Sequence, residues 1–160
     1  MTPDIEDSAR VVDSEVGDSE IREYVTIHDS GVGDDCQIYE RVSIKKSTIS
    51  DCVDINAGSY IENAEIGPNV QIAPNSNVVG VTHELTEQGM EFRNDMFERV
   101  ILQKGAFVGA GAVVGPGVEV GEQSVVAAGA TVSRDIGRKK LVLGSPPSQR
   151  IIDIEDWLNR

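Results

Sequence analysis

Aromatic residues are scarce in this sequence of 160 residues, at 4% of the chain. A core must therefore be filled mainly by aliphatic side chains, which favours thin layers. Basic residues are also few, since 14 Lys and Arg stand against 27 Asp and Glu, giving a formal net charge of -13. Nucleic acids and anionic membranes both bind basic faces, so neither is expected as the main partner. The acid excess fits adaptation to high salt and equally an ordinary acidic cytosolic protein.

Long apolar runs are missing too. No segment approaches the roughly 18 apolar residues of a membrane span, and the first residues lack a charged start followed by an apolar run. We therefore expect a soluble cytoplasmic protein. The two cysteines, Cys36 and Cys52, have no metal-site spacing and fit a reducing compartment. Cys36 occupies a position expected to fill the core, and no metal site is expected.

The sequence does contain a strict six-residue repeat. A helix repeats at 3.6 residues and a lone amphipathic strand at 2, so a period of six fits neither. It predicts one short strand and one corner per repeat, stacked into a parallel β-helix. The aliphatic residues of this repeat, three of them directly followed by glycine, are Leu102, Val108, Val114, Val120, Val126 and Val132.

The N-terminal half carries the same pattern with one shorter step. There the steps between aliphatic residues run 6, 5 and 6, so three of them add up to 17 residues. The sequence thus predicts triangular coils of 17 residues here and 18 from Leu102 on, within a β-helix domain over residues 1–143. Met1 to Asp7 carry too little pattern to place. The residues predicted to lie above one another are Ile21, Ile38, Ile55 and Ile72, and likewise Ile27, Ile44, Ile61 and Val78.

Two segments break the repeat. Residues 79–99 are polar, contain no hexad, and are predicted to be an extended functional loop. Their apolar Met90, Phe92, Met96 and Phe97 are expected to pack on a neighbouring subunit or, alternatively, back on their own coil. Residues 144–160 are predicted to form a turn and then a short amphipathic helix, from Ile151 to Leu158, that caps the open end.

Several motifs between about Ile55 and Ile151 resemble the hexapeptide-repeat acetyltransferases, in particular the maltose/galactoside and nucleotide-sugar branch. The resemblance implies a left-handed β-helix and a homotrimer. It also implies sites between subunits that transfer acetyl from acetyl-CoA to a sugar hydroxyl or amine. The segments that carry it are Ile66–Asn75, Thr82–His83, Val113–Gly121, Val125–Ile136 and Gly144–Ile151.

The resemblance also assigns roles to residues. His83 matches the catalytic histidine, and Asn56 matches an asparagine that orients the acceptor. The maltose/galactoside enzymes have an N-terminal helical region that is lacking here, and their usual Asn-Pro-Ala is Ser145–Pro147 in this chain. The positions that match the lining of the coenzyme site are Phe107, where many relatives have tryptophan, and Ala110, Ala128, Ser133 and Arg134.

The chemistry expected of His83 follows from the reaction. Acetyl-CoA is an activated thioester, so the difficult step is to make the acceptor nucleophilic at neutral pH. A neutral imidazole is suited to take the acceptor's proton, and Glu84 or another carboxylate could orient the ring. No acyl-enzyme is needed when both substrates share one groove.

A basic segment supports an anionic coenzyme independently. Between Arg134 and Arg150 the chain has five basic residues and one acid, Asp135. We expect this segment, Lys139, Lys140 and Arg150 included, to bind the phosphates of CoA. The alternative is a solvated basic segment that merely reduces repulsion.

Two other classes of protein share this architecture. The γ-type carbonic anhydrases use three histidines on one metal, whereas this chain has only His28 and His83. The two lie about three coils apart, roughly 14 Å along the axis, which disfavours a shared metal. A non-catalytic scaffold is the remaining alternative, and it would be favoured if no coenzyme binds.

Overall fold

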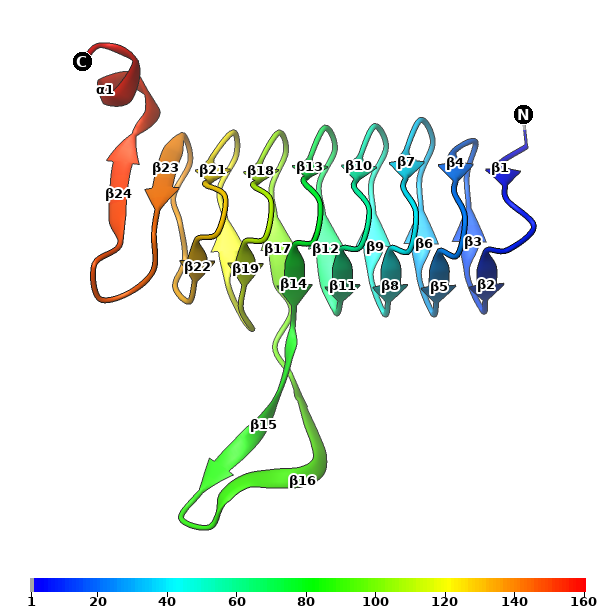
Figure 1. The fold of residues 1–160 in the computed structure, drawn as a ribbon, viewed down its shortest axis with the longest axis horizontal. Coiled ribbons are helices and arrows are strands. Elements are labelled where there is room, and N and C mark those ends of the chain that lie inside the picture. The colour runs from blue at the N-terminus through cyan, green and yellow to red at the C-terminus, as the bar shows by residue number, and fades with distance from the viewer. Residues whose placement is uncertain (1) are drawn as a thin grey trace.

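Three sheets, parallel except for the last strand of one, wrap around one column of aliphatic side chains in residues 2–160, the part of the chain that the computed structural model describes (Figure 1). Sheet A consists of β1 (Asp4–Ile5), β4 (Glu20–Ile21), β7 (Gln37–Ile38), β10 (Asp54–Ile55), β13 (Gln71–Ile72), β18 (Phe107–Val108), β21 (Val125–Val126), β23 (Lys140–Leu143) and β24 (Arg150–Asp153). Sheet B consists of β2 (Arg10–Val12), β5 (Thr26–His28), β8 (Ser43–Lys45), β11 (Tyr60–Glu62), β14 (Asn77–Val79), β19 (Val113–Val114) and β22 (Thr131–Val132). Sheet C consists of β3 (Glu15–Val16), β6 (Gly31–Val32), β9 (Thr48–Ile49), β12 (Ala64–Ile66), β17 (Val100–Leu102) and β20 (Glu119–Val120).

The strand register confirms the predicted coils. Ile38 pairs with Ile21 on one side and Ile55 on the other, so successive coils are 17 residues apart. Val108 pairs with Val126, which gives the predicted 18. The parallel β-helix expected from the repeat is therefore the fold of this chain.

The core contains the residues that the pattern predicts. The aliphatic residue of each repeat and the small residue two positions before it both point inward, and nearly all of them are fully buried. Buried serines satisfy their hydroxyls between coils: the Ser47 hydroxyl donates to the Lys45 carbonyl at 2.7 Å and accepts from the Ala64 amide at 3.0 Å. Cys36 is 1% exposed and fills the core as expected. Burial raises the pKa of its thiol.

The predicted loop over residues 79–99 is wrong in its secondary structure. Its central part is an antiparallel hairpin of β15 (Val81–Thr86) and β16 (Gly89–Phe97), which forms a separate two-stranded sheet. The chain turns between the strands at Glu87 and Gln88, and the following Gly89 has φ +99, a conformation that favours glycine. A hexad search cannot detect this hairpin because its strands pair with each other and not with the coils.

The C-terminal prediction is also partly wrong. Residues 150–153 form a strand that pairs antiparallel with β23, and the helix α1 covers only Ile154–Leu158. Pairing supplies partners for backbone groups at the edge of β23, which a helix at this place would leave unpaired. Within the described helix no residue is buried, and α1 lies beyond the last strand of sheet A and does not cap the column (Figure 1). At the N-terminal end, where the repeat is too weak to predict a structure, Asp4–Ile5 pair with β4.

Among residues 2–160, no helix has both the length and the apolar character that a membrane crossing requires.

Candidate functional site

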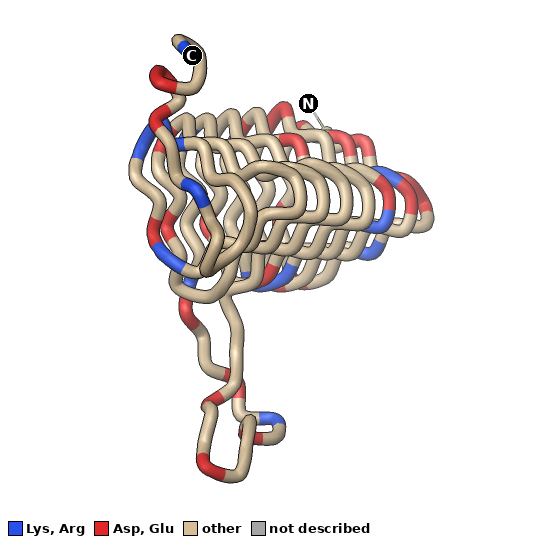
Figure 2. The backbone as a smooth tube through the Cα atoms, turned by 60° about the vertical axis from the view of Figure 1, so that its left-hand side comes forward, with Lys and Arg blue, Asp and Glu red and all other residues tan. Residues whose placement is uncertain are grey.

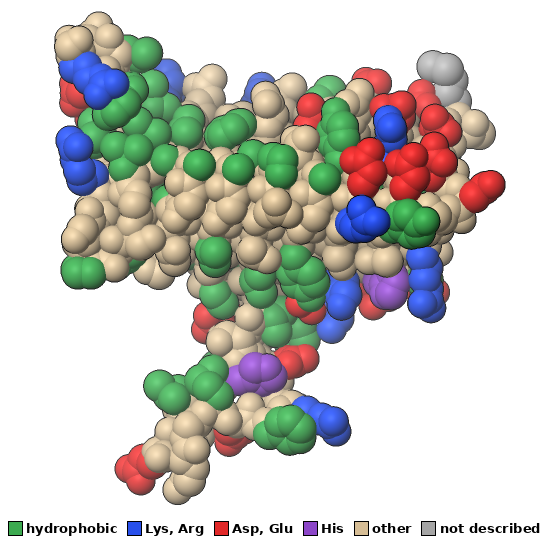
Figure 3. All heavy atoms as spheres, viewed as in Figure 1, with side chains coloured by type: hydrophobic (Ala, Val, Ile, Leu, Met, Phe, Trp, Pro, Cys, Tyr) green, Lys and Arg blue, Asp and Glu red, His purple; other side chains and the backbone are tan. Residues whose placement is uncertain are grey.

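The hairpin leaves the column at the corner between sheets B and C, after β14, and the chain returns at β17. It projects away from the coils, so that most of its surface faces solvent (Figures 1 and 3). Of its apolar side chains, five are exposed in the described structure, so the alternative that they pack back on their own coil is not observed, although the Phe97 ring lies near Lys46 of the coil. The five side chains are Leu85, Met90, Phe92, Met96 and Phe97.

The base of the hairpin is held firmly to the column. The Gly80 amide donates to the Glu62 carbonyl at 2.8 Å, and its carbonyl accepts from the Glu98 amide at 2.8 Å and from the Asn63 side-chain amide at 2.8 Å. A Cβ atom at position 80 would collide with the carbonyl oxygen of Asn63, so this close approach requires glycine. The direction in which the hairpin leaves the column is therefore fixed by its base.

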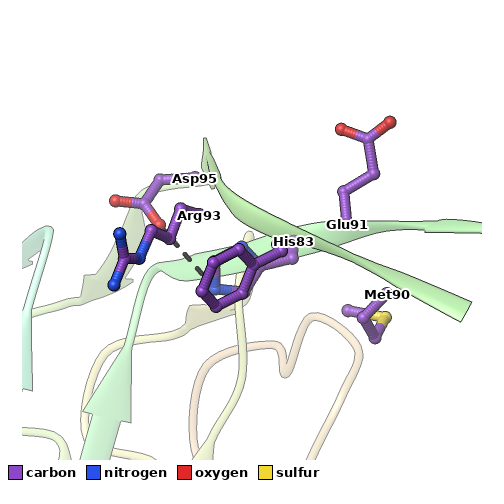
Figure 4. A pocket seen from close by; sticks show the side chains of 6 residues that line it. His83, Met90, Glu91, Arg93 and Asp95 are labelled. Atoms are coloured by element: carbon purple, nitrogen blue, oxygen red, sulfur yellow. Dashed lines mark ion pairs between the residues drawn. The ribbon is translucent and has the colours of Figure 1, made fainter.

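An irregular register in the hairpin builds a hollow around His83. His83 pairs with Asp95, but Leu85 pairs with Met90, so β16 has more residues than β15 over this stretch. The extra residues bulge and place side chains on both sides of the imidazole (Figure 4). The hollow measures about 470 Å³ and is lined by His83, Met90, Glu91, Phe92, Arg93 and Asp95.

The two ring nitrogens of His83 have different surroundings. Nδ1 lies 3.1 Å from the backbone carbonyl oxygen of Asn94, and Nε2 lies 3.7 Å from a carboxylate oxygen of Asp95. A carbonyl can only accept a hydrogen bond, so a neutral ring making this contact carries its proton on Nδ1. Nε2 then has a free lone pair and can accept a proton, and Asp95 can stabilise the resulting imidazolium.

Asp95 is the carboxylate that sequence reasoning missed. Glu84, the candidate next to His83, does not line the hollow and forms no ion pair with the ring among the described residues. Asp95 is twelve residues away in the sequence and faces His83 only through the hairpin register. The sequence pattern does not reveal this pairing, because the extra residues of β16 interrupt the alternation of side chains between the two faces of the hairpin.

Asn56 lies at another corner of the column, between sheets A and B, after β10. Its side-chain amide donates to the Ile72 carbonyl at 3.2 Å, and the residue is half-buried. The hairpin leaves from the corner between sheets B and C. A single chain therefore does not bring Asn56 and His83 to one corner.

Ala110 and Ala128 share the corner of Asn56. They lie in successive coils, where the Gly129 amide donates to the Ala110 carbonyl at 2.9 Å, and both side chains are exposed. Phe107 points outward from the strand that leads into this corner and pairs with Val125. Three of the predicted coenzyme residues thus line one edge of the column.

Ser133 and Arg134 lie elsewhere, at the corner after β22 between sheets B and C. With Pro146, Pro147 and Gln149 they line a hollow of about 300 Å³. The Gln149 side-chain amide donates to the Thr131 carbonyl at 2.6 Å and ties the turn to this corner. The structure thus joins two predicted coenzyme residues to the Pro-Pro turn that departs from the usual motif.

The basic segment does not form one uniform patch. Lys140 forms an ion pair with Asp153. A hollow of about 740 Å³ beside it is lined by Arg138 and Lys139 but also by Asp153, Glu155 and Asp156. Figure 2 shows basic and acidic segments next to each other at this end of the column. The positive charge of residues 134–150 is therefore partly offset by acids just beyond this segment in the sequence. Arg150 is exposed in β24.

The two histidines are well separated in the structure. His28 belongs to β5 of sheet B, and His83 belongs to the hairpin (Figure 3). Within residues 2–160, no three His, Cys, Asp or Glu side chains are grouped so as to hold a metal ion.

Comparison with known protein families finds the same six-residue repeat. A family model described as bacterial transferase hexapeptide (six repeats) matches residues 99–134. The galactoside O-acetyltransferase of Lactococcus lactis is 31% identical over 99 residues, covering 62% of this chain and 44% of that protein. The chain spans less than half the length of the curated relatives that it matches.

Two solved structures share the fold. A mutant of AntD, an N-acyltransferase from Bacillus cereus in complex with dTDP-4-amino-4,6-dideoxyglucose and coenzyme A, superimposes with a TM-score of 0.77 at 19% identity, covering 92% of this chain and 88% of that one. PerB from Caulobacter crescentus, in complex with CoA and GDP-perosamine, gives a TM-score of 0.58 at 24% identity, covering 92% and 55%. At these identities the likeness shows the fold alone, a left-handed parallel β-helix.

The observed coils, the matched repeats and the shared fold point to one class of protein. Residues 99–134 carry the repeat of the bacterial transferase hexapeptide family, and the whole column has the left-handed β-helix fold.

Proposed function

We propose that this protein is an acetyl-CoA-dependent acetyltransferase whose acceptor is a hydroxyl or amine of a sugar or nucleotide-linked sugar. The observation that carries the proposal is the environment of His83. The Asn94 carbonyl at Nδ1 directs the lone pair of the neutral ring to Nε2, beside the carboxylate of Asp95. This arrangement is suited to a general base.

The proton path follows from that geometry. The acceptor oxygen or nitrogen attacks the thioester carbonyl while His83 Nε2 takes its proton. Asp95 stabilises the imidazolium until the C–S bond breaks and the proton passes to the departing CoA sulfur. No electron acceptor is needed, because one C–O or C–N bond replaces one C–S bond.

The active site is proposed to lie between subunits of a homotrimer. Two observations support this arrangement. The hairpin exposes Met90, Phe92 and Phe97, whose burial would be favourable. In addition, His83 and Asn56 occupy different corners of one chain, so a neighbouring subunit would have to bring the acceptor-orienting Asn56 to the base.

We propose that the coenzyme lies along the C-terminal coils. Phe107, Ala110 and Ala128 would contact its pantetheine arm, and Ser133 and Arg134 would lie in the hollow with the Pro-Pro turn. Lys139, Lys140 and Arg150 would contact its phosphates, with Lys140 exchanging its present partner Asp153. AntD and PerB, which share the fold, are described with CoA and a nucleotide sugar bound, and this supports both substrate classes. A reaction that uses acetyl-CoA is consistent with the cytoplasmic location expected from the sequence.

Calorimetric titration with acetyl-CoA and with free CoA, at low and high salt, is the direct test. Binding at one site per chain, weaker at high salt, supports the transferase and justifies a screen of sugar acceptors by thiol release. Absence of binding under both conditions would refute it and favour a scaffold that uses the hairpin for assembly.

A further inference from the structure

A second group of basic side chains lies on the outward face of sheet B, away from the C-terminal segment. His28 and Lys45 are neighbours in the strand register, and Lys46 follows at the adjoining corner. Figure 3 shows a histidine flanked by Lys and Arg side chains along the lower edge of the coils. We call His28, Lys45 and Lys46 the sheet B cluster.

The polar groups of the sheet B cluster lack partners. Among the described residues, neither lysine forms an ion pair, although the chain has nearly twice as many acids as bases. Each ammonium lies instead over an aromatic ring, Lys45 at 5.5 Å from the Tyr60 centroid and Lys46 at 4.7 Å from that of Phe97. His28 Nε2 is buried without a hydrogen-bond partner in the described structure. The cluster can therefore bind an added anion without first breaking an ion pair.

The neighbouring carboxylate is engaged elsewhere. Glu62 follows Lys45 in the register, but its Oε2 accepts a hydrogen bond from the Tyr60 hydroxyl at 2.5 Å. Burial and the nearby Glu62 raise the pKa of Tyr60 to about 12, so this hydroxyl stays protonated and keeps donating. Because Glu62 is hydrogen-bonded to Tyr60, Lys45 has no ion-pair partner among the described residues and can bind an anion.

The sheet B cluster adjoins the face of the hairpin that carries His83. Lys46 contacts Phe97, which pairs with Val81, and His83 is two residues after Val81. Residues two apart in a strand share a face, so Phe97, Val81 and His83 point to the same side, with Val81 and His83 about 7 Å apart along the strand. Lys46 and His83 therefore lie toward the same side of the hairpin, with Phe97 and Val81 between them.

We propose that Lys45 and Lys46, beside His28, bind the diphosphate of a nucleotide-linked sugar acceptor and so present its sugar to His83; this inference rests on the proposed function. Lysines bind phosphate as point charges, and the His28 ring lies beside Lys45 in the strand register. The sheet B cluster makes the enzyme select sugars that carry a diphosphate over free sugars.

The test is calorimetric titration with UDP in the presence of saturating CoA, which keeps UDP out of the coenzyme site. Lys45→Gln and Lys46→Gln should each weaken UDP binding about tenfold, and Lys→Arg at either position should restore most of it. The matched control is Lys104→Gln, an exposed lysine at a different corner, which should leave UDP binding unchanged.

Steady-state kinetics separate this role from a structural one. With a nucleotide-linked sugar as acceptor, the two Gln variants should raise the KM for that sugar and leave kcat and the KM for acetyl-CoA unchanged. Equal UDP affinity in the variants and the wild type would overturn the sheet B cluster alone. Failure of the wild type to bind acetyl-CoA would instead overturn the proposed function on which it rests.

Discussion

The coils and the hairpin of this chain are stabilised in opposite ways. In the coils from Ile21 on, the repeats contribute inward aliphatic residues that are almost completely buried, and outward residues matter little to the core. In the hairpin, two strands pair only with each other, and their largest apolar side chains remain exposed. The comparison indicates that the coils carry stability, while the hairpin is the region to which we assign the proposed chemistry and assembly. Substitutions in the two regions should therefore affect different measurements.

The largest effect on activity is expected at the hairpin. His83→Ala removes the proposed base and should lower turnover by about 10²–10⁴-fold, while the melting temperature and acetyl-CoA affinity should stay unchanged. Thiol release from CoA measures turnover, and Glu87→Gln at the exposed hairpin tip is the matched control. Wild-type turnover in His83→Ala would remove this histidine from the mechanism.

The largest effect on stability is expected in the coils. Leu102→Ala creates a cavity at a fully buried position and should lower the free energy of unfolding by about 2–5 kcal/mol in urea denaturation. Leu158 in α1 is 74% exposed, so Leu158→Ala creates no cavity. It should lower the free energy of unfolding by less than about 0.5 kcal/mol. Similar costs at both positions would contradict the account of the core.

Assembly should depend on the hairpin and not on the coils. The double variant Met90→Ser and Phe92→Ser removes exposed apolar surface and should shift the protein from trimer toward monomer in sedimentation velocity. The far-ultraviolet circular dichroism should not change, because neither side chain contributes to the core. A trimer of undiminished stability would show that subunits associate through another face.

A smaller effect is expected from the partner of His83. Asp95→Asn keeps the shape but removes the charge that stabilises the imidazolium. A partly exposed ion pair contributes up to about 1 kcal/mol, so turnover should fall roughly fivefold, far less than in His83→Ala. Glu84→Gln serves as the control, since its carboxylate is outside the hollow. Equal losses of turnover in both variants would show that the total negative charge of the hairpin, and not Asp95 in particular, stabilises the imidazolium.

The smallest effect concerns the two thiols. Burial raises the pKa of Cys36, so the folded state retains a proton that the unfolded state releases. The free energy of unfolding should therefore decrease as the pH rises above about 9, the pKa of an unperturbed thiol. In the folded protein, iodoacetamide should modify the exposed Cys52 and spare Cys36. Cys36→Ala should abolish this part of the pH dependence, and an unchanged slope would assign it to other groups.

The coils can be predicted from the sequence because each inward position repeats, so that counting residues is enough to align Ile21, Ile38 and Ile55. The partner of His83 cannot be found this way, since Asp95 reaches it only through an irregular hairpin register. The C-terminal strand is mistaken for a helix because Ile151 and Ile152 fit an apolar helical face as well as a strand edge. The sequence does not predict that Asp153 and Glu155 offset the charge of the basic segment, because they lie just beyond its end and reach it only in the folded chain.

The register continues across the hairpin without disturbance. Val78 pairs with Val114 and Ile66 with Leu102, each 36 residues apart, so the coil closes as if the inserted segment were not there. Residues between Gly80 and Arg99 can thus be lengthened, shortened or exchanged without moving any core residue. A protein built this way can exchange one insertion over evolution while every strand of its column keeps its register.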